Sequence, residues 1–402
     1  MDHIGRSSAP LVQVGRPDML IEDVRISPLA GDRVEVSATC GGRPLYFRLP
    51  ASRFSQQAVG DALVVSVLAP AMLTASTIRI PEGLAVSSAL AAQLDGAQRV
   101  WMSWNARLKK VRLEAARYEP VPAKDGVGLF YAGGVDSSYS LLAHLEEIDS
   151  LIIALGFDHT MSDDEVNESL ERNGRFARAL GKALIPVETN HSRFVFDHGV
   201  SRTFVFGATL AAIGLLLGMR RCYIATSHSA ANAMPEGSHP ALDHRFSNGA
   251  TEIVHDDISV SRFEKTCAIA KRPDLLENLR VCWEFPNYNC GECLKCLRTM
   301  TELRLSGAQG PFPPLNGLRR VRDMAAHTEV EYVMSMLLAA HAKGDGKLER
   351  ELKKGLRRHD WGEVLRYLDL ALTGGRLLRR SRARSAEADL VKVNLRPDID
   401  LD

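Results

Sequence analysis

The sequence predicts an α/β protein with a doubly wound parallel sheet, a strand-rich N-terminal region and a helical C-terminal region. Two observations lead to this prediction. Short apolar strands alternate with helices from about residue 126 to residue 226, as in a parallel sheet covered by helices on both faces. A Gly-Gly pair also stands between the first of these strands and the helix after it. Because 402 residues exceed one ordinary domain, we divide the chain into residues 1–120, 121–305 and 306–402.

Residues 1–120 are expected to form a strand-rich domain of unassigned role. Patterns of apolar and polar residues predict four strands, at 20–26, 33–40, 44–49 and 62–68. Gly31-Asp32 and Gly41-Gly42 predict turns, and residues 84–94 predict a helix. No chemical motif occurs in this region, so recognition of a partner protein or of a protein substrate is our hypothesis for it.

Residues 121–305 are expected to hold the parallel sheet. Strands are predicted at 127–131, 151–157, 183–188 and 222–226. The segments between them predict helices, at 137–147, 163–180 and 207–218. The order strand–helix–strand repeats, which favours a parallel sheet with helices on both faces.

Residues 306–402 are predicted to be mostly helical, most clearly at 329–340 and 361–372. Five arginines follow, at Arg376, Arg379, Arg380, Arg382 and Arg384. We interpret this run as a solvated helix end or tail, and a nucleic-acid contact is the weaker alternative.

The composition favours a soluble globular protein, with 45% apolar and 25% charged residues. A formal net charge of +1 provides no overall field for nucleic acid or an anionic membrane. We find no apolar run of the ~20 residues that a membrane span needs, and no signal-peptide core near Met1. We therefore expect a cytoplasmic protein that does not cross a membrane.

The glycine pair is the first candidate binding feature. Gly133 and Gly134 permit positive φ and close approach of the backbone to a ligand. At the start of a helix the amide groups and the helix dipole favour phosphate, and Ser137 and Ser138 add hydroxyl donors. Asp136 can hold Mg²⁺ or orient the loop. The alternative is an ordinary glycine turn. The strand before the loop and the helix after it favour a phosphate-binding loop over this alternative.

A cluster of cysteines is the most specific local signal. The spacing Cys282-x7-Cys290-x2-Cys293-x2-Cys296 can surround one tetrahedral ion with four thiolates. Zinc is the favoured ion, and an iron–sulfur cluster is the alternative. The chain has seven cysteines, and this odd number argues against a secreted disulfide framework.

The loop and the cysteines together resemble a known family. The run Tyr131-Ala132-Gly133-Gly134-Val135-Asp136-Ser137-Ser138 is similar to the Ser-Gly-Gly-x-Asp-Ser loop of the PP-loop ATP pyrophosphatases, with Ala132 in place of the first serine. The segment from Cys282 to Cys296, followed by Arg298, resembles the zinc knuckle of the 7-cyano-7-deazaguanine synthase (QueC-like) branch. The resemblance covers about residues 126–300.

This resemblance implies a PP-loop, adenine nucleotide alpha hydrolase-like fold that binds ATP, Mg²⁺ and Zn²⁺. The residues from Tyr131 to Ser138 would bind ATP, and so, more loosely, would Gly156, Phe157 and Asp158 after the second strand. The implied activity is an AMP- and pyrophosphate-forming ligase. It would adenylate a carboxylate or amide of a small, deazapurine-like substrate, which ammonia or an amine then attacks.

Four polar residues further along the chain are candidates for catalysis beside Asp136 and Ser137. His228 and His239 follow the fourth strand and are candidate substrate ligands or acid–base groups. Each histidine alone is more often structural. Arg262 and Lys265 are candidates for binding phosphate or the adenylate, and a solvated helix face is an equal alternative.

Two other functions stay open from the sequence. Some PP-loop proteins thiolate tRNA, and Ala132 is also compatible with an ATP-binding module that has no activity. We expect a small-molecule substrate and a homodimer.

Overall fold

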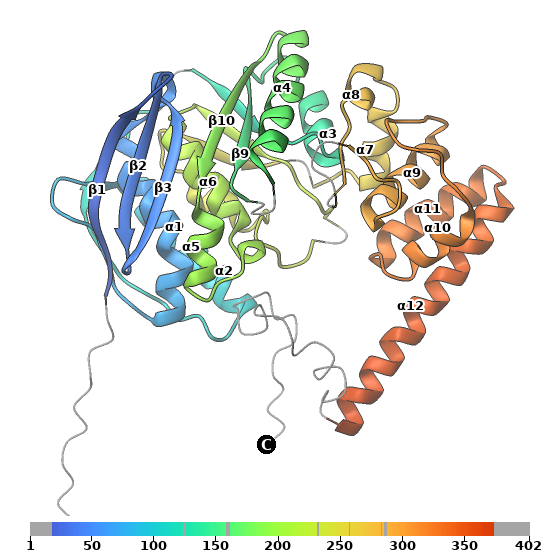
Figure 1. The fold of residues 1–402 in the computed structure, drawn as a ribbon. Coiled ribbons are helices and arrows are strands. Elements are labelled where there is room, and N and C mark those ends of the chain that lie inside the picture. The colour runs from blue at the N-terminus through green and yellow to red at the C-terminus, as the bar shows by residue number, and fades with distance from the viewer. Residues whose placement is uncertain are drawn as a thin grey trace, which may run out of the picture.

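The computed structural model describes residues 18–373, except 124, 158–160, 231–232, 257, 283 and 285–287. In this part of the chain a ten-stranded sheet occupies one side and the centre of the molecule, and helices form the opposite side (Figure 1). Asp158 and the arginine run at 376–384 lie outside the described residues.

Five neighbouring strands of the sheet are parallel. They are β8 (Val127–Phe130), β9 (Ser150–Leu155), β10 (Ala183–Thr189), β11 (Arg221–Ile224) and β12 (Glu252–His255). Their order in the sheet is β12, β11, β8, β9, β10. The chain thus runs outward from β8 through β9 and β10, then returns to the other side of β8, so the strand order reverses between β8 and β11. The predicted α/β fold and its four predicted parallel strands are confirmed.

Helices cover both faces of the parallel strands. On one face, α3 (Val135–Ala143) and α4 (Asp163–Ala179) contribute to a core with Leu129 and Leu151. On the other face, α1 (Val59–Thr74) and α6 (Phe206–Leu217) share a core with Phe130 and Ile152. Because α6 contacts both β11 and α1, it is buried nearly all round, which explains its continuous apolar sequence.

The three N-terminal strands extend the same sheet. β1 (Met19–Leu29), β2 (Arg33–Cys40) and β3 (Arg43–Pro50) are antiparallel, as their alternating pattern predicts. β3 pairs antiparallel with β10, and Arg48 in β3 forms an ion pair with Glu188 in β10 at 2.8 Å. Residues before and after position 120 therefore share one sheet and one core. The three-part division of the chain stays a prediction.

The strand predicted at 62–68 is wrong, because these residues lie within α1. Helix α1 is buried on almost every side, so its apolar run shows no period that separates a helix from a strand. By length and composition, residues Gln56–Thr74 are long and apolar enough to cross a membrane, although the sequence suggested no such segment. However, 83% of the stretch is buried inside the fold, as in the core helix of a soluble protein.

The helix predicted at 84–94 begins later and ends later than expected, as α2 (Ser88–Trp104). Ser87 caps it, since its hydroxyl accepts hydrogen bonds from the amides of Ala89 and Leu90. The smaller elements of the described chain are β4 (Ile78–Arg79), β5 (Ala85–Ser87), β6 (Leu113–Glu114), β7 (Ala116–Tyr118), α5 (His191–Asp197), α7 (Arg262–Ile269) and α8 (Pro273–Glu277).

The C-terminal part of the described chain is helical, as predicted. It consists of α9 (Leu294–Ser306), α10 (Leu318–Ala325), α11 (Val330–Ala342) and α12 (Gly346–Thr373). Val321, Val333 and Leu352 help form its separate core, and α12 extends away from the body (Figure 1). Because α11 packs against both α7 and α9, its first turn comes close to the carboxyl ends of the parallel strands.

Candidate functional site

The loop after β8 has the geometry that its two glycines allow. Gly133 has φ of +79°, and a Cβ there would lie 3.1 Å from the carbonyl oxygen of Asn278. The Gly133 carbonyl accepts a hydrogen bond from the Arg280 amide at 2.7 Å. The Gly134 N–H of the same planar peptide therefore points the opposite way. Gly134 is the N-cap of α3, where the first amides of the helix have no partner within the helix.

A cavity of about 300 Å³ lies next to this loop. Gly134, Asp136 and Ser137 line one side of it, and Phe157 and Phe206 line another. The cavity lies at the carboxyl ends of β8, β9 and β11, where the strand order reverses. Open α/β sheets bind their ligands at such a point. Its apolar wall and polar loop together suit a ligand with a flat apolar part and an anionic part.

Apart from Gly133, the predicted loop residues divide into two groups. The cavity is lined by Tyr131, Ala132, Gly134, Asp136 and Ser137. In contrast, Val135 and Ser138 are buried, with 1% and 0% of their surface exposed, so their side chains belong to the core. The Tyr131 ring also faces the core, where it stacks on Phe176 and its hydroxyl accepts a hydrogen bond from Asn278.

The residues after β9 shape the opposite wall. Gly156 has φ of +90°, and a Cβ there would lie 1.9 Å from the carbonyl oxygen of Thr189, so only glycine fits. Phe157 contacts Phe206 edge to face at 5.3 Å, and its carbonyl accepts a hydrogen bond from Arg202. Phe157 therefore lines the cavity, whereas Gly156 lets the chain pass close to Thr189, and ATP binding by the two residues stays a prediction.

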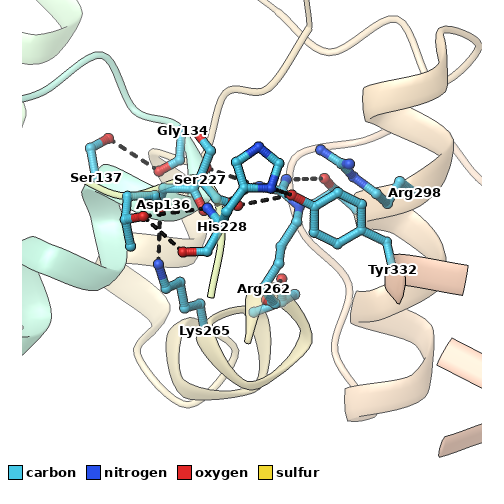
Figure 2. A network of polar contacts seen from close by, with 12 residues as sticks. Gly134, Asp136, Ser137, Ser227, His228, Arg262, Lys265, Arg298 and Tyr332 are labelled. Atoms are coloured by element: carbon cyan, nitrogen blue, oxygen red, sulfur yellow. Dashed lines mark hydrogen bonds and ion pairs between the residues drawn. The ribbon is translucent and has the colours of Figure 1, made fainter. Parts of the chain in front are cut away.

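Asp136, Arg262 and Lys265 come together at the start of α3 (Figure 2). The Arg262 Nη1 lies 3.1 Å from an Asp136 carboxylate oxygen. The Lys265 Nζ donates to the Thr226 carbonyl at 2.9 Å. Arg262 and Lys265 are 7% and 2% exposed, so the alternative of a solvated helix face is wrong for these two residues.

His228 lies beside this charged group, whereas His239 does not contact it. The His228 Nε2 is 3.1 Å from the Glu236 carboxylate, and this interaction raises the pKa of His228 against the opposing effect of burial. His239 lies against Trp104, and its Nδ1 accepts a hydrogen bond from the Ala241 amide. Burial lowers the pKa of His239. Within the described chain its contacts with Trp104 and Ala241 are those of a structural histidine.

A buried Asp–His–Thr chain lies behind the site. The His255 Nδ1 is 2.9 Å from the Asp243 carboxylate, and its Nε2 is 2.9 Å from the Thr226 hydroxyl. Because Thr226 also provides the carbonyl that Lys265 contacts, this chain fixes the partner of the lysine. From the sequence we assigned no role to His255, Asp243 or Thr226.

Tyr332, Arg298 and Lys295 are further members of the site that the sequence did not assign to it. Tyr332, in α11, donates a hydrogen bond to the Ser227 carbonyl at 2.8 Å. The Arg298 guanidinium lies 4.4 Å from the centre of the Tyr332 ring (Figure 2). Burial and the neighbouring Arg262 and Arg298 lower the pKa of Lys295 to about 8. Of these three residues, only Arg298 could be noticed in the sequence, because it directly follows the cysteine knuckle.

The four cysteines form a compact cluster. The Sγ atoms of Cys282, Cys290, Cys293 and Cys296 all lie within 4.8 Å of one another. The separation is 3.9 Å between Cys282 and Cys293, and 3.8 Å between Cys290 and Cys296. A tetrahedron with metal–sulfur bonds of about 2.3 Å has edges of about 3.8 Å. The cluster therefore fits a single ion such as zinc, whereas cysteines that bind different irons of a cluster are spread further apart.

The knuckle geometry explains the sequence of the cluster. The Cys290 sulfur accepts hydrogen bonds from the amides of Glu292 and Cys293, each at 3.3 Å. Gly291 has φ of +72°, and a Cβ there would lie 2.4 Å from Pro313. Cys293 is the N-cap of α9, so a bound ion would anchor the helix that carries Arg298.

Comparison of the chain with protein-family models, with curated proteins and with solved structures finds no match. The geometry of the site is therefore the main basis for a functional proposal.

Proposed function

We propose that the chain is an ATP-dependent, AMP-forming ligase of the PP-loop type. The observation that carries this proposal is the position of the Gly133-Gly134 loop. It joins β8 to α3 where the strand order reverses, and it borders the 300 Å³ cavity. Phosphate binds readily at such a helix start, and the apolar wall at Phe157 and Phe206 suits a purine base.

The charged residues support roles in binding the triphosphate. Asp136 lines the cavity and can hold Mg²⁺ together with phosphate oxygens, because Mg²⁺ often takes only one or two protein carboxylates. Mg²⁺ would neutralise phosphate charge there. Arg262 and Lys265 would stabilise the charge on the departing pyrophosphate, and their burial strengthens this effect.

The proposed reaction has two displacements. A carboxylate or amide oxygen of a small, deazapurine-like substrate attacks the α-phosphorus of ATP, and pyrophosphate leaves. Ammonia or an amine then attacks the activated carbon, AMP leaves with the oxygen, and the nucleophile releases its proton. The resemblance of the Cys282–Cys296 knuckle to QueC-like enzymes supports this substrate class, and the ion in the knuckle would have a structural role.

The test is to mix the purified chain with ATP, Mg²⁺, ammonia and a panel of deazapurine carboxylates, and to measure AMP and pyrophosphate. We expect Asp136→Asn to lower the rate of AMP formation by about 100-fold. The matched control is Asp163→Asn, the same change on the exposed first turn of α4. If no substrate pool yields AMP, or if both variants behave alike, the proposal fails.

One observation favours a second candidate, an ATP-binding module without turnover. Ala132 is exposed at the cavity, where the family loop has a serine hydroxyl. Because the side chain is exposed, we expect Ala132→Ser to keep stability and to tighten ATP binding about fivefold through one added hydrogen bond. Titration calorimetry measures the affinity. Binding that stays unchanged, with no AMP from either protein, would favour the module.

A further inference from the structure

His228 lies between two hydrogen-bond acceptors that come from different parts of the chain. Its Nε2 is 3.1 Å from the carboxylate of Glu236, on the loop after β11. Its Nδ1 is 3.4 Å from the hydroxyl of Tyr332, in the first turn of α11. The rings of His228 and Tyr332 also stack, with centroids 6.3 Å apart and an interplanar angle of 24° (Figure 2).

The direction of each hydrogen bond follows from the partners. The Tyr332 hydroxyl donates its only proton to the Ser227 carbonyl at 2.8 Å, since a carbonyl can only accept. Toward His228 the Tyr332 oxygen therefore acts as an acceptor. Glu236 as a carboxylate also accepts. A neutral imidazole has one N–H, whereas the imidazolium has two, so this pair of acceptors favours the charged form.

We infer that Tyr332 is a positioning residue that keeps His228 as a cation at the candidate nucleotide site, the site beside the Gly133-Gly134 loop. The C-terminal helical bundle thereby completes a site whose loop belongs to the parallel sheet. The ligand of this cation would be phosphate, either of ATP or of the departing pyrophosphate, and this part of the inference rests on the proposed function.

The other carboxylates around His228 agree with this inference, whereas the nearby cations oppose a charge on its ring. Glu329, at the N-cap of α11, and Asp136, in α3, both favour the charged imidazole and add to the effect of Glu236 in raising its pKa. Cations face the same region from two helices, namely Arg262 and Lys265 in α7 and Arg298 in α9.

A second hydrogen bond connects the loop after β11 with α11. The Ser229 hydroxyl donates to the Glu331 carboxylate at 3.1 Å, one residue before Tyr332. On its other side Tyr332 contacts Arg298, whose guanidinium carbon lies 4.4 Å from the ring centre. The tyrosine therefore fixes two cations, His228 through its hydroxyl and Arg298 through its ring.

The test uses Tyr332→Phe, which removes the hydroxyl that contacts His228 and keeps the aromatic ring. The matched control is Tyr223→Phe, because Tyr223 also stacks on a histidine, His144, and its hydroxyl donates to Glu147 at 2.8 Å. Nuclear magnetic resonance measures the pKa of His228, whose signal His228→Gln identifies. Titration calorimetry measures the affinity for Mg²⁺ and ATP, and thermal unfolding shows that each variant is folded.

We expect Tyr332→Phe to lower the measured pKa of His228 by roughly half to one unit and to weaken ATP binding about fivefold at pH 7. Tyr223→Phe should change neither quantity. An unchanged pKa of His228 in Tyr332→Phe overturns the inference, as does a lowered pKa with unchanged affinity. If the natural chain binds no ATP, the proposed function fails, and the pKa measurement still decides whether Tyr332 holds His228 as a cation.

Discussion

At the scale of single residues, the two glycines of the loop have different physical roles. Gly133 adopts a φ of +79° with the Asn278 carbonyl nearby, so a side chain there is strained and crowded. Gly134 has φ of −73°, and a Cβ there would meet only the Ser137 hydroxyl, at 3.9 Å. Gly133 is thus required by the fold, whereas Gly134 leaves room for a ligand.

The different roles of Gly133 and Gly134 predict different effects of replacing each of them with alanine. We expect Gly133→Ala to lower the free energy of unfolding by at least about 1 kcal/mol, because alanine disfavours positive φ. Gly134→Ala should leave stability nearly unchanged but weaken ATP binding, because the methyl group would occupy space at the phosphate. Urea unfolding and titration calorimetry measure the two effects. Equal stability of the two variants would contradict this account of the loop.

Arg262 shows how much a buried charge depends on its partners. Its guanidinium is near the carboxylates of Asp136, at 3.1 Å, and Glu302, at 3.6 Å, and Glu302 is only 1% exposed. We expect Arg262→Leu to lower the free energy of unfolding by about 3 kcal/mol, because it leaves a buried carboxylate without its partner.

The control for Arg262 is an exposed ion pair. Arg79 lies 2.6 Å from Asp18 at the surface, where water screens the interaction. Arg79→Leu should therefore shift the urea midpoint very little. A similar shift for both arginines would mean that the pairing of Arg262 contributes no more than a surface contact.

At the scale of elements, α1 contains a proline that the rest of the fold accommodates. Pro70 lies inside the helix and has no N–H, so the Ser66 carbonyl loses its usual partner four residues later. The Nε2 of His191, in α5, lies 3.0 Å from this carbonyl and donates to it. His191 is fully buried, and burial lowers its pKa from 6.5 to about 4. It is therefore neutral near pH 7.

The lowered pKa predicts a pH dependence of stability. As the pH falls below 6.5, the unfolded chain binds a proton at His191 before the folded chain does, so this contribution declines between pH 6.5 and about 4. The expected loss over this window is about 3 kcal/mol. His191→Gln keeps a donor for Ser66 but does not titrate. Chemical unfolding of both proteins from pH 7 to pH 4 measures the difference, and parallel curves would contradict it.

The hydrogen bond between His191 and the Ser66 carbonyl also shows where sequence reasoning fails, because the two residues lie far apart in the sequence. The parallel strands were predictable as short apolar runs, α4 as an amphipathic helix, and α6 as an apolar run too long for a typical strand. Helix α1 was not, because burial on all sides removes the period. The glycine loop and the cysteine knuckle are local in sequence, so both were found. Tyr332 lies more than 100 residues from Ser227, and only the packed fold brings them together.

At the scale of the whole molecule, the cysteine cluster connects the sheet with the helical bundle. Cys282 begins the knuckle, and Cys293 and Cys296 belong to the cap and first turn of α9. The same helix carries Thr299 and Glu302, which contact Arg262. An ion bound by the four cysteines would therefore fix the start of α9 and, through it, Arg262 and the loop.

We expect the purified chain to hold one zinc ion, measured by mass spectrometry of the metal. Cys290→Ser should lose the zinc and lower the free energy of unfolding by at least about 3 kcal/mol, because the ion's binding energy contributes to folding. It should also weaken ATP binding, since α9 would no longer position Arg262. The control is Cys267→Ser, a cysteine outside the cluster. Visible absorbance from iron, or equal zinc content in both variants, would contradict a structural zinc site that supports the nucleotide loop.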